Sequence, residues 1–80
     1  MPRNWTYIDN ARLRVPAWGG EDPDFRMTGV WLRDCRIYWC GPRSSWERWA
    51  ACVFEGCTMS GCIITFQRDA ELAIKEHAWT

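Results

Sequence analysis

The side chains with the most chemical potential are cysteines, which recur at an interval of five residues as Cys52, Cys57 and Cys62. Thiols at this interval could bind a metal, form disulfides or mark a repeating architecture. The C-x4-C-x4-C spacing matches no zinc motif, and the only histidine, His77, has no second histidine to act with. The chain also has no convincing acid–base pair and no glycine-rich phosphate loop. We therefore expect no metal, no cofactor and no enzyme activity.

Length, charge and the N-terminal residues narrow the class of protein further. The 80 residues predict one small domain (1–80), and ten basic and ten acidic side chains give no net charge. Zero net charge argues against a protein that binds nucleic acid directly by bulk attraction. Residues 1–10 lack the apolar stretch of a secretory signal, and no segment approaches the length of a membrane span. The sequence thus predicts a cytoplasmic protein, in which five cysteines, an odd number, favour free thiols.

The elements that must position the cysteines are predicted from the same interval. A large apolar residue follows two positions after each of the three cysteines, at Phe54, Met59 and Ile64. Helices favour spacings of three and four, and flat strands favour two, so a period of five indicates a coiled repeat. The same phase runs through residues 5–14 and 25–40.

Offsets along the sequence predict how these blocks stack. Leu13 precedes Leu32 by 19 residues, Leu32 precedes Phe54 by 22, and several other pairs repeat both offsets. A square coil of four pentapeptides needs about 20 residues, so each offset is close to one turn. The glycine- and proline-containing loops 15–24 and 41–49 would absorb the difference. The predicted inward columns are Leu13–Leu32–Phe54 and Ile37–Met59.

On residues 5–14, 25–40 and 50–66, the chain resembles the pentapeptide-repeat family. The resemblance implies a mainly β fold, namely a short, irregular, right-handed quadrilateral β-helix of about three coils within residues 5–66. In that fold a small residue and the central large apolar residue of each unit point inward. All five cysteines would take the small inward position, with Cys35 over Cys57 and Cys40 over Cys62.

The five-residue phase ends after Phe66, and the composition of the chain changes there. Residues 69–79 are rich in helix-forming side chains, and Asp69 is a plausible N-cap. We expect a C-terminal α-helix that covers an exposed sheet edge of the coil. The alternative is a short strand through "ELAIKEH", residues 71–77.

The candidate binding residues are carboxylates and tryptophans on the outward phases. Asp34 and Glu55 fall on outward positions of adjacent predicted coils, and the loop acids Glu21, Asp22 and Asp24 would extend them into an acidic strip. The alternative for the loop acids is an ordinary solvated turn. Trp31 and Trp39 also fall on outward phases, where an exposed tryptophan is a candidate hot spot for protein binding.

The resemblance implies a function that needs no catalysis. Pentapeptide-repeat proteins include rod-shaped DNA mimics that block DNA-handling enzymes, and the size of this chain is similar to that of small phage-encoded anti-CRISPR proteins. We therefore expect an inhibitor, a monomer or weak homodimer, that acts in the host cytoplasm. It would block target DNA binding by a type I surveillance complex, by steric occlusion or with carboxylates standing in for phosphates.

Two other classes stay open from the residues. One is a structural or scaffolding module that associates through the ends of its coil. The other is a thiol redox or metal protein. The absence of net charge weakens DNA mimicry more than it weakens inhibition, because mimics of DNA are usually strongly acidic. An inhibitor that uses aromatic contacts is compatible with a neutral chain.

Overall fold

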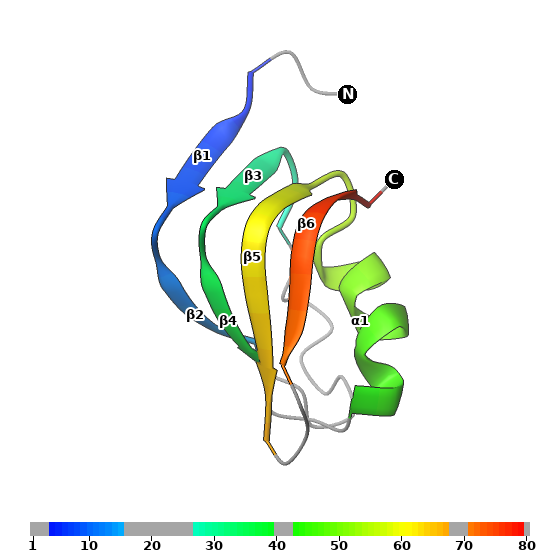
Figure 1. Cartoon of the computed structure of the whole chain (residues 1–80). Coiled ribbons are helices and arrows are strands. Elements are labelled where there is room, and N and C mark those ends of the chain that lie inside the picture. The colour runs from blue at the N-terminus through cyan, green and yellow to red at the C-terminus, as the bar shows by residue number, and fades with distance from the viewer. Residues whose placement is uncertain (1–3, 16–26, 40–42, 68–70, 80) are drawn as a thin grey trace.

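The computed structural model describes residues 4–15, 27–39, 43–67 and 71–79, which form a curved six-stranded sheet with one helix against it (Figure 1). The first four strands are β1 (Thr6–Asp9), β2 (Arg12–Val15), β3 (Val30–Arg33) and β4 (Arg36–Trp39). A 3-10 turn, η1 (Arg43–Ser45), leads into the helix α1 (Trp46–Val53). The last two strands are β5 (Thr58–Phe66) and β6 (Leu72–Ala78). The protein is mainly β, as expected, but the one α-helix of the described residues is α1 and not the predicted C-terminal helix.

The sheet is built of stacked levels, and each level is one extended stretch of chain that bends in the middle. β1 and β2 form the first level, β3 and β4 the second, and the longer β5 forms the third by itself. Parallel pairing joins β1 to β3 and β3 to the first half of β5, and likewise β2 to β4 and β4 to its second half. β6 then adds to β5 in the antiparallel direction.

The bend repeats at one place in every level, where a residue adopts a left-handed backbone. Asn10 and Asp34 both have φ of 54°, and Gly61 has φ of 65°. Glycine, asparagine and aspartate are the residues that accept this conformation at least cost. The levels remain bonded through the bend, since the Asn10 and Asp34 amides donate to the Arg33 and Ser60 carbonyls at 2.9 Å.

A second column of left-handed residues lies five positions earlier and explains the five-residue period. Gly29 (φ 70°) precedes Asp34, and Gly56 (φ 77°) precedes Gly61. The side of the sheet that contains β3 is therefore one pentapeptide long between two bends. The period of five in the sequence records the distance between the bends.

The core lies between the concave face of the sheet and α1. Ile8, Leu32 and Met59 form an inward column on one side of the bend, and Leu13, Ile37 and Ile64 form another on the other side. An aromatic cluster fills the space under the helix, with Trp39, Trp46, Phe54 and Phe66 at most 3% exposed. The ring of Trp79 also meets this cluster, 5.5 Å from Phe54.

The helix α1 forms because its apolar residues recur at helical spacing. Trp46, Ala50 and Val53 are buried on one face, whereas Glu47 and Cys52 are exposed. Glu47 lies in the first turn, where a carboxylate interacts favourably with the helix dipole. The helix replaces the predicted loop 41–49 at residues 46–49, and it also includes residues 50–53 of the predicted coil.

The quadrilateral β-helix predicted from the resemblance is wrong. In the described residues each level has two sides, and the chain then passes through a helix or through residues outside the description. The pairing register is also wrong, by five residues in each case: Leu13 pairs with Ile37 and Leu32 with Met59. Because the pattern repeats every five residues, a slip of one unit preserves every inward and outward position, so the pattern alone could not detect it.

The predicted C-terminal helix over residues 69–79 is also wrong. β6 occupies Leu72–Ala78, and the alternative of a strand through residues 71–77 is the one observed. Helix propensity is a weak prior that tertiary pairing overrides. Here Leu72 and Ile74 are half-buried opposite Ile64 and Cys62, whereas their neighbours are exposed, which is strand alternation.

The cysteines divide into buried and exposed positions. Cys35, Cys57 and Cys62 are each about 1% exposed, as expected for small core fillers. Cys52 is exposed on α1, so its predicted inward position is wrong. The predicted stacking of Cys35 over Cys57 is wrong too, because Cys35 lies one residue before the Arg36–Ile63 pair and therefore beside Cys62. Cys40 lies outside the described residues.

Buried thiols also join the levels of the stack. The thiol of Cys35 donates to the carbonyl of Ile8 at 3.3 Å, and the thiol of Cys62 donates to the carbonyl of Leu32 at the same distance. Burial raises the pKa of the Cys57 and Cys62 thiols. Cys57 and Cys62 are therefore protonated structural residues at neutral pH. None of the helices within the described ranges is long and apolar enough to cross a membrane.

Candidate functional site

The convex face of the sheet carries side chains from β1, β3 and the first half of β5 in two rows. The pairing places Tyr7 beside Trp31, and in the next row it places Asp9 beside Arg33 and Arg33 beside Ser60. These residues alternate with the inward column of Ile8, Leu32 and Met59, so they lie on the side of the sheet away from the core. The convex face therefore brings exposed side chains from three strands next to one another.

Trp5, which precedes β1, joins Tyr7, Trp31 and Arg33 in a row of contacting side chains, and we refer to these four residues as the aromatic ladder. Trp5 meets Trp31 edge to face, with ring centroids 5.4 Å apart. Tyr7 stacks on Trp31 at 5.9 Å and 30°, and the Arg33 guanidinium lies 4.1 Å from the centre of the Tyr7 ring. Distances of this size are favourable for aromatic and cation–π contacts.

Hydrogen bonds fix the ladder to the sheet. The indole Nε1 of Trp31 donates to the Ser60 hydroxyl at 2.8 Å. The guanidinium of Arg33 donates to both carboxylate oxygens of Asp9, with Nη2 to Oδ2 at 2.9 Å. This bond to Arg33 holds the pKa of the Asp9 carboxyl below its usual range and raises the pKa of Arg33. The ladder is thus ordered while Tyr7 stays 48% exposed.

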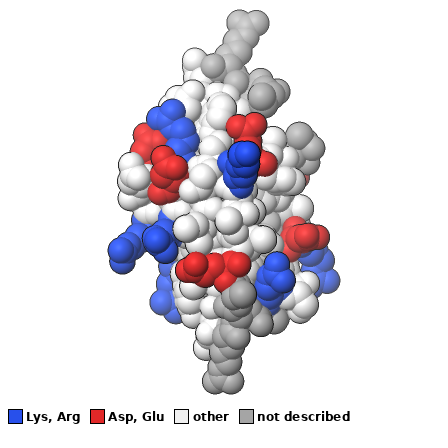
Figure 2. Space-filling model, viewed as in Figure 1, with Lys and Arg blue, Asp and Glu red and all other residues white. Residues whose placement is uncertain are grey.

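The other half of the convex face is basic. The pairing places Arg12 beside Arg36 and Arg14 beside Tyr38, with the Arg14 guanidinium 5.3 Å from the centre of the Tyr38 ring. Figure 2 shows basic side chains gathered where β2 and β4 lie in Figure 1. A shallow cleft of about 320 Å³ runs between Arg12, Arg36, Tyr38 and their neighbours. The carboxylate of Glu71 approaches Arg36 only at 3.9 Å between two largely exposed side chains, which is a weak contact.

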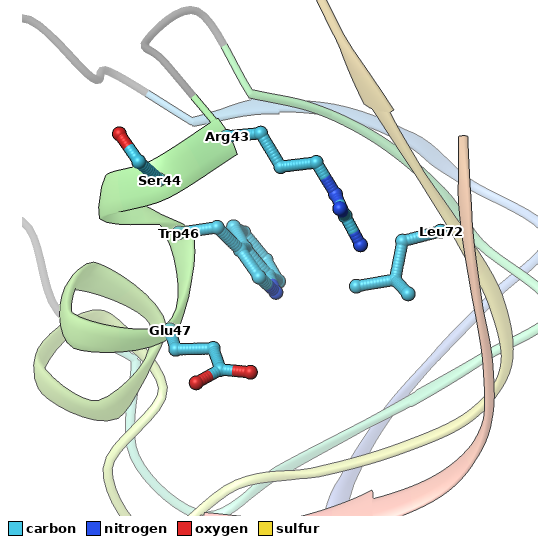
Figure 3. Close-up of a pocket in the computed structure, with 5 residues that line it drawn as sticks. All are labelled: Arg43, Ser44, Trp46, Glu47 and Leu72. Carbon is cyan, nitrogen blue, oxygen red and sulfur yellow. The ribbon is translucent and has the colours of Figure 1, made fainter. Parts of the chain in front are cut away.

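A second opening, of about 520 Å³, lies beside the start of α1 (Figure 3). Arg43 and Trp46 point into it from the helix side, Leu72 faces them from the sheet, and Ser44 points away. The guanidinium of Arg43 lies 5.6 Å from the centre of the Phe66 ring. The residues described around this opening supply one cation, the carboxylate of Glu47 and an apolar wall, and among them no set of groups is suited to catalysis.

The predicted acidic strip does not form from the described residues. Asp34 lies at the bend, level with Gly61, whereas Glu55 precedes Gly56, which pairs with Gly29 at the other end of β3. The two ends of β3, at which Asp34 and Glu55 lie, are separated by five residues of strand, or about 16 Å. Both carboxylates are exposed, as predicted, but they do not share one surface strip. Glu21, Asp22 and Asp24 lie outside the described residues.

The two predicted tryptophans have different positions. Trp31 is partly exposed on the convex face, where it joins the ladder. Trp39 is 0% exposed, so its predicted outward position is wrong. β4 keeps its strand alternation up to its last residue, so Trp39 lies on the inward side with Ile37, two residues before it, and packs against Trp46 at 5.4 Å.

Sequence reasoning missed Trp5, Tyr7 and the role of Arg33. A signal for them was present, because an offset of 24 residues aligns Tyr7 with Trp31 and Asp9 with Arg33. The offset of 19 aligned Asp9 with Thr28 instead, which offers no charge complement. Opposite charges and aromatic rings on adjacent strands stabilise a sheet, so scoring cross-strand pairs would have favoured the observed register.

The described residues contain no group of three or more histidine, cysteine or acidic side chains that could hold a metal ion. The strongest candidate site is therefore the convex face, with its aromatic ladder on one side of the bend and its basic half on the other. Comparison with known proteins adds no relative, because no family model, no curated protein and no solved structure matches the chain.

Proposed function

We propose that the protein is a binding protein that acts by occupying a surface of a macromolecular partner with its aromatic ladder. The observation that carries this proposal is Trp31, which is held between Trp5 and Tyr7, hydrogen-bonded to Ser60 and still accessible from outside. Tryptophan, tyrosine and arginine are the residues that most often dominate protein interfaces. A ladder that is already ordered loses little conformational entropy on binding.

The first partner to test is the one that the sequence resemblance implies, a type I CRISPR surveillance complex. Among the described residues, Asp9 is bonded to Arg33, and Asp34 and Glu55 lie at opposite ends of β3. The proposed mode of inhibition is therefore steric occlusion through aromatic contacts, in place of phosphate mimicry by an acidic strip. The anti-CRISPR role stays a proposal that rests on the resemblance.

The experiment measures target DNA binding by the surveillance complex with and without the protein. We expect the parent protein to block DNA binding and Trp31→Ala to weaken the block by about thirtyfold or more, because truncating a hot-spot residue costs at least about 2 kcal/mol. Tyr38→Ala is the matched control, since Tyr38 is a partly exposed ring on the same face but outside the ladder. Circular dichroism would confirm that both variants fold.

A charge-reversed variant separates occlusion from mimicry. Asp34→Lys with Glu55→Lys should leave the block unchanged at low and at high salt if the ladder makes the contact, because aromatic contacts are screened little. A strong loss in this variant, together with a block that fades with salt, would favour mimicry over the ladder. A parent protein that leaves DNA binding unaffected would reject this partner.

A structural or scaffolding module is the second candidate function. The observation that favours it is the edge of the sheet at β1 and β2, which pairs with other described strands on one side only. An open edge is a template for association with another chain. The geometry of this edge supports a more specific inference.

A further inference from the structure

The edge formed by β1 and β2 has unpaired backbone groups within the described residues. Among the described strands, β1 pairs only with β3, and β2 pairs only with β4. The amides of Thr6 and Asn10 donate to carbonyls of the second level. The amides of Tyr7 and Asp9 therefore point to the opposite side of β1, outward from the open edge. In β2 the Ala11 carbonyl accepts from Arg36, which leaves the amides of Arg12 and Arg14 facing the edge.

We propose that this edge pairs with the same edge of a second copy of the chain, antiparallel and about a two-fold axis through the bend. The edge has four strand residues on each side of the bend, Thr6–Asp9 and Arg12–Val15, with Asn10 and Ala11 between them. A two-fold axis between Asn10 and Ala11 places the bends of the two copies together. β1 of each copy then lies beside β2 of the other copy.

The backbone groups fit this pairing. Tyr7 lies opposite the partner's Arg14, and Asp9 lies opposite the partner's Arg12. All four residues direct their amides and carbonyls outward from the edge, toward the partner, as the hydrogen-bonded pairs of an antiparallel ladder require. Ile8 lies opposite the partner's Leu13, and neither faces the edge, so these two form the intervening non-hydrogen-bonded pair. A slip by one residue would place edge-facing groups opposite groups that point away.

The side chains fit as well. Opposed residues of an antiparallel pair point to the same face of the sheet. Tyr7, Asp9, Arg12 and Arg14 are all exposed on the convex face, whereas Ile8 and Leu13 both pack against the core. The pairing therefore brings the Asp9 carboxylate to the partner's Arg12 and the Tyr7 ring to the partner's Arg14. A carboxylate has lone pairs enough to accept from the partner's Arg12 while it keeps its bonds to Arg33.

Charge distribution selects the antiparallel arrangement. Along the edge, the carboxylate lies in β1 and the two guanidiniums lie in β2. A parallel arrangement in register would oppose Arg12 to Arg12, which is unfavourable. The antiparallel arrangement opposes unlike charges twice by symmetry. Because the bend must coincide in both copies, it also fixes the register.

The test is association of the whole chain measured by sedimentation velocity across protein concentrations. We expect a reversible dimer, because eight strand residues from each copy make a small interface. Arg12→Glu should weaken dimerisation by about tenfold or more, since it places two carboxylates opposite one another at both symmetric pairs. Arg36→Glu is the matched control, because Arg36 is the neighbour of Arg12 on β4 and does not lie on the edge.

A mixing experiment isolates the charge pairs from effects on folding. Asp9→Lys alone and Arg12→Glu alone should each be poor homodimers. Mixed together, they should form a heterodimer, because both Asp9–Arg12 contacts then join unlike charges again. Circular dichroism of each variant would confirm a folded chain.

Amide hydrogen exchange reports on the backbone pairing directly. The amides of Tyr7, Asp9, Arg12 and Arg14 should become slower to exchange as the protein concentration rises, while those of Ile8 and Leu13 should be slow throughout. Three results would overturn the proposal: a monomer at every concentration up to about 1 mM, a dimer insensitive to Arg12→Glu, or edge amides whose protection does not depend on concentration. The Trp31→Ala variant leaves the edge intact, so this test is independent of the partner test above.

Discussion

Two aromatic groups lie on opposite faces of the same sheet and differ mainly in what covers them. The aromatic cluster under α1 joins Trp39, Trp46 and Phe66 at centroid distances of 5.4–6.0 Å, all at most 3% exposed. The ladder joins Trp5, Tyr7 and Trp31 at 5.4–5.9 Å, yet Tyr7 is 48% exposed. Similar ring contacts therefore serve folding where a helix covers them and remain available for binding where nothing described covers them.

The largest difference between the two groups should be in stability. Trp46 contacts Trp39, Phe54, Phe66 and Trp79 and is 3% exposed, so Trp46→Ala should lower the free energy of unfolding by about 3–5 kcal/mol. That is a large fraction of the stability of a small domain. Trp31→Ala should cost only about 1 kcal/mol, mostly from the hydrogen bond to Ser60. Urea unfolding followed by circular dichroism measures both, and equal losses would refute the distinction.

A substitution at the bend of β5 should affect both groups, because one half of this strand supports the ladder and the other half supports the core. Gly61 has φ of 65°, and a Cβ placed there would lie 2.5 Å from Oδ1 of Asp34. Gly61→Ala should therefore lower the free energy of unfolding by about 1–3 kcal/mol. Adding Asp34→Gly should recover the part that comes from the clash, and a double-mutant cycle measures that recovery. A fully additive double variant would show that the clash is absent.

Thiol reactivity should show the same contrast between buried and exposed positions, and it is measured without any substitution in the chain. Because burial raises the pKa of the Cys57 and Cys62 thiols, the thiolate fraction at a given pH is lower than for an ordinary cysteine. In the folded protein at pH 8, iodoacetamide should modify exposed Cys52 before Cys35, Cys57 and Cys62. Peptide mapping by mass spectrometry measures the order. Faster modification of Cys62 than of Cys52 would contradict the buried position.

The period of the sequence predicted which positions face the core, but it predicted four-sided coils where each level has two sides in the described residues, and it could not select the partner of each strand. Spacings of five residues correspond to the distance between bends, as Gly29–Asp34 and Gly56–Gly61 show. Inward positions such as Leu32, Ile37, Met59 and Ile64 were correctly assigned to the core. A slip of five residues changes none of these assignments. The register therefore depends on contacts between particular side chains of adjacent strands, which the inward and outward pattern does not contain.

The ends of the pattern were the least predictable. Residues 46–53 contain apolar side chains and a cysteine, as the repeat blocks do. Trp46, Ala50 and Val53 are nevertheless spaced for a helix, and this helix covers the concave face. Residues 72–78 have helix-forming composition, but the free edge of β5 offers hydrogen bonds and a place for Leu72 and Ile74. In both segments tertiary contacts decided the outcome against the local prior.

The candidate site was predicted in part. Trp31 was correctly assigned to the outward face, and Trp39 was not, because β4 continues its alternation from Ile37 to Trp39 and places both on the inward side. The acidic strip depended on the wrong register, which placed Asp34 and Glu55 on neighbouring positions. Aromatic and charged residues that meet across levels are recognisable only once the offset of 24 residues is known.

The position of β5 has a consequence for how the chain folds. β5 is the strand to which β3, β4 and β6 all bond, and it comes late in the sequence. The parallel partners of each strand lie 24 or 27 residues away, so most of the sheet forms through non-local contacts. Folding should therefore be slow for a chain of this size, in the millisecond-to-second range typical of high contact order. During synthesis, the first four strands would stay without their central partner until Phe66 has left the ribosome.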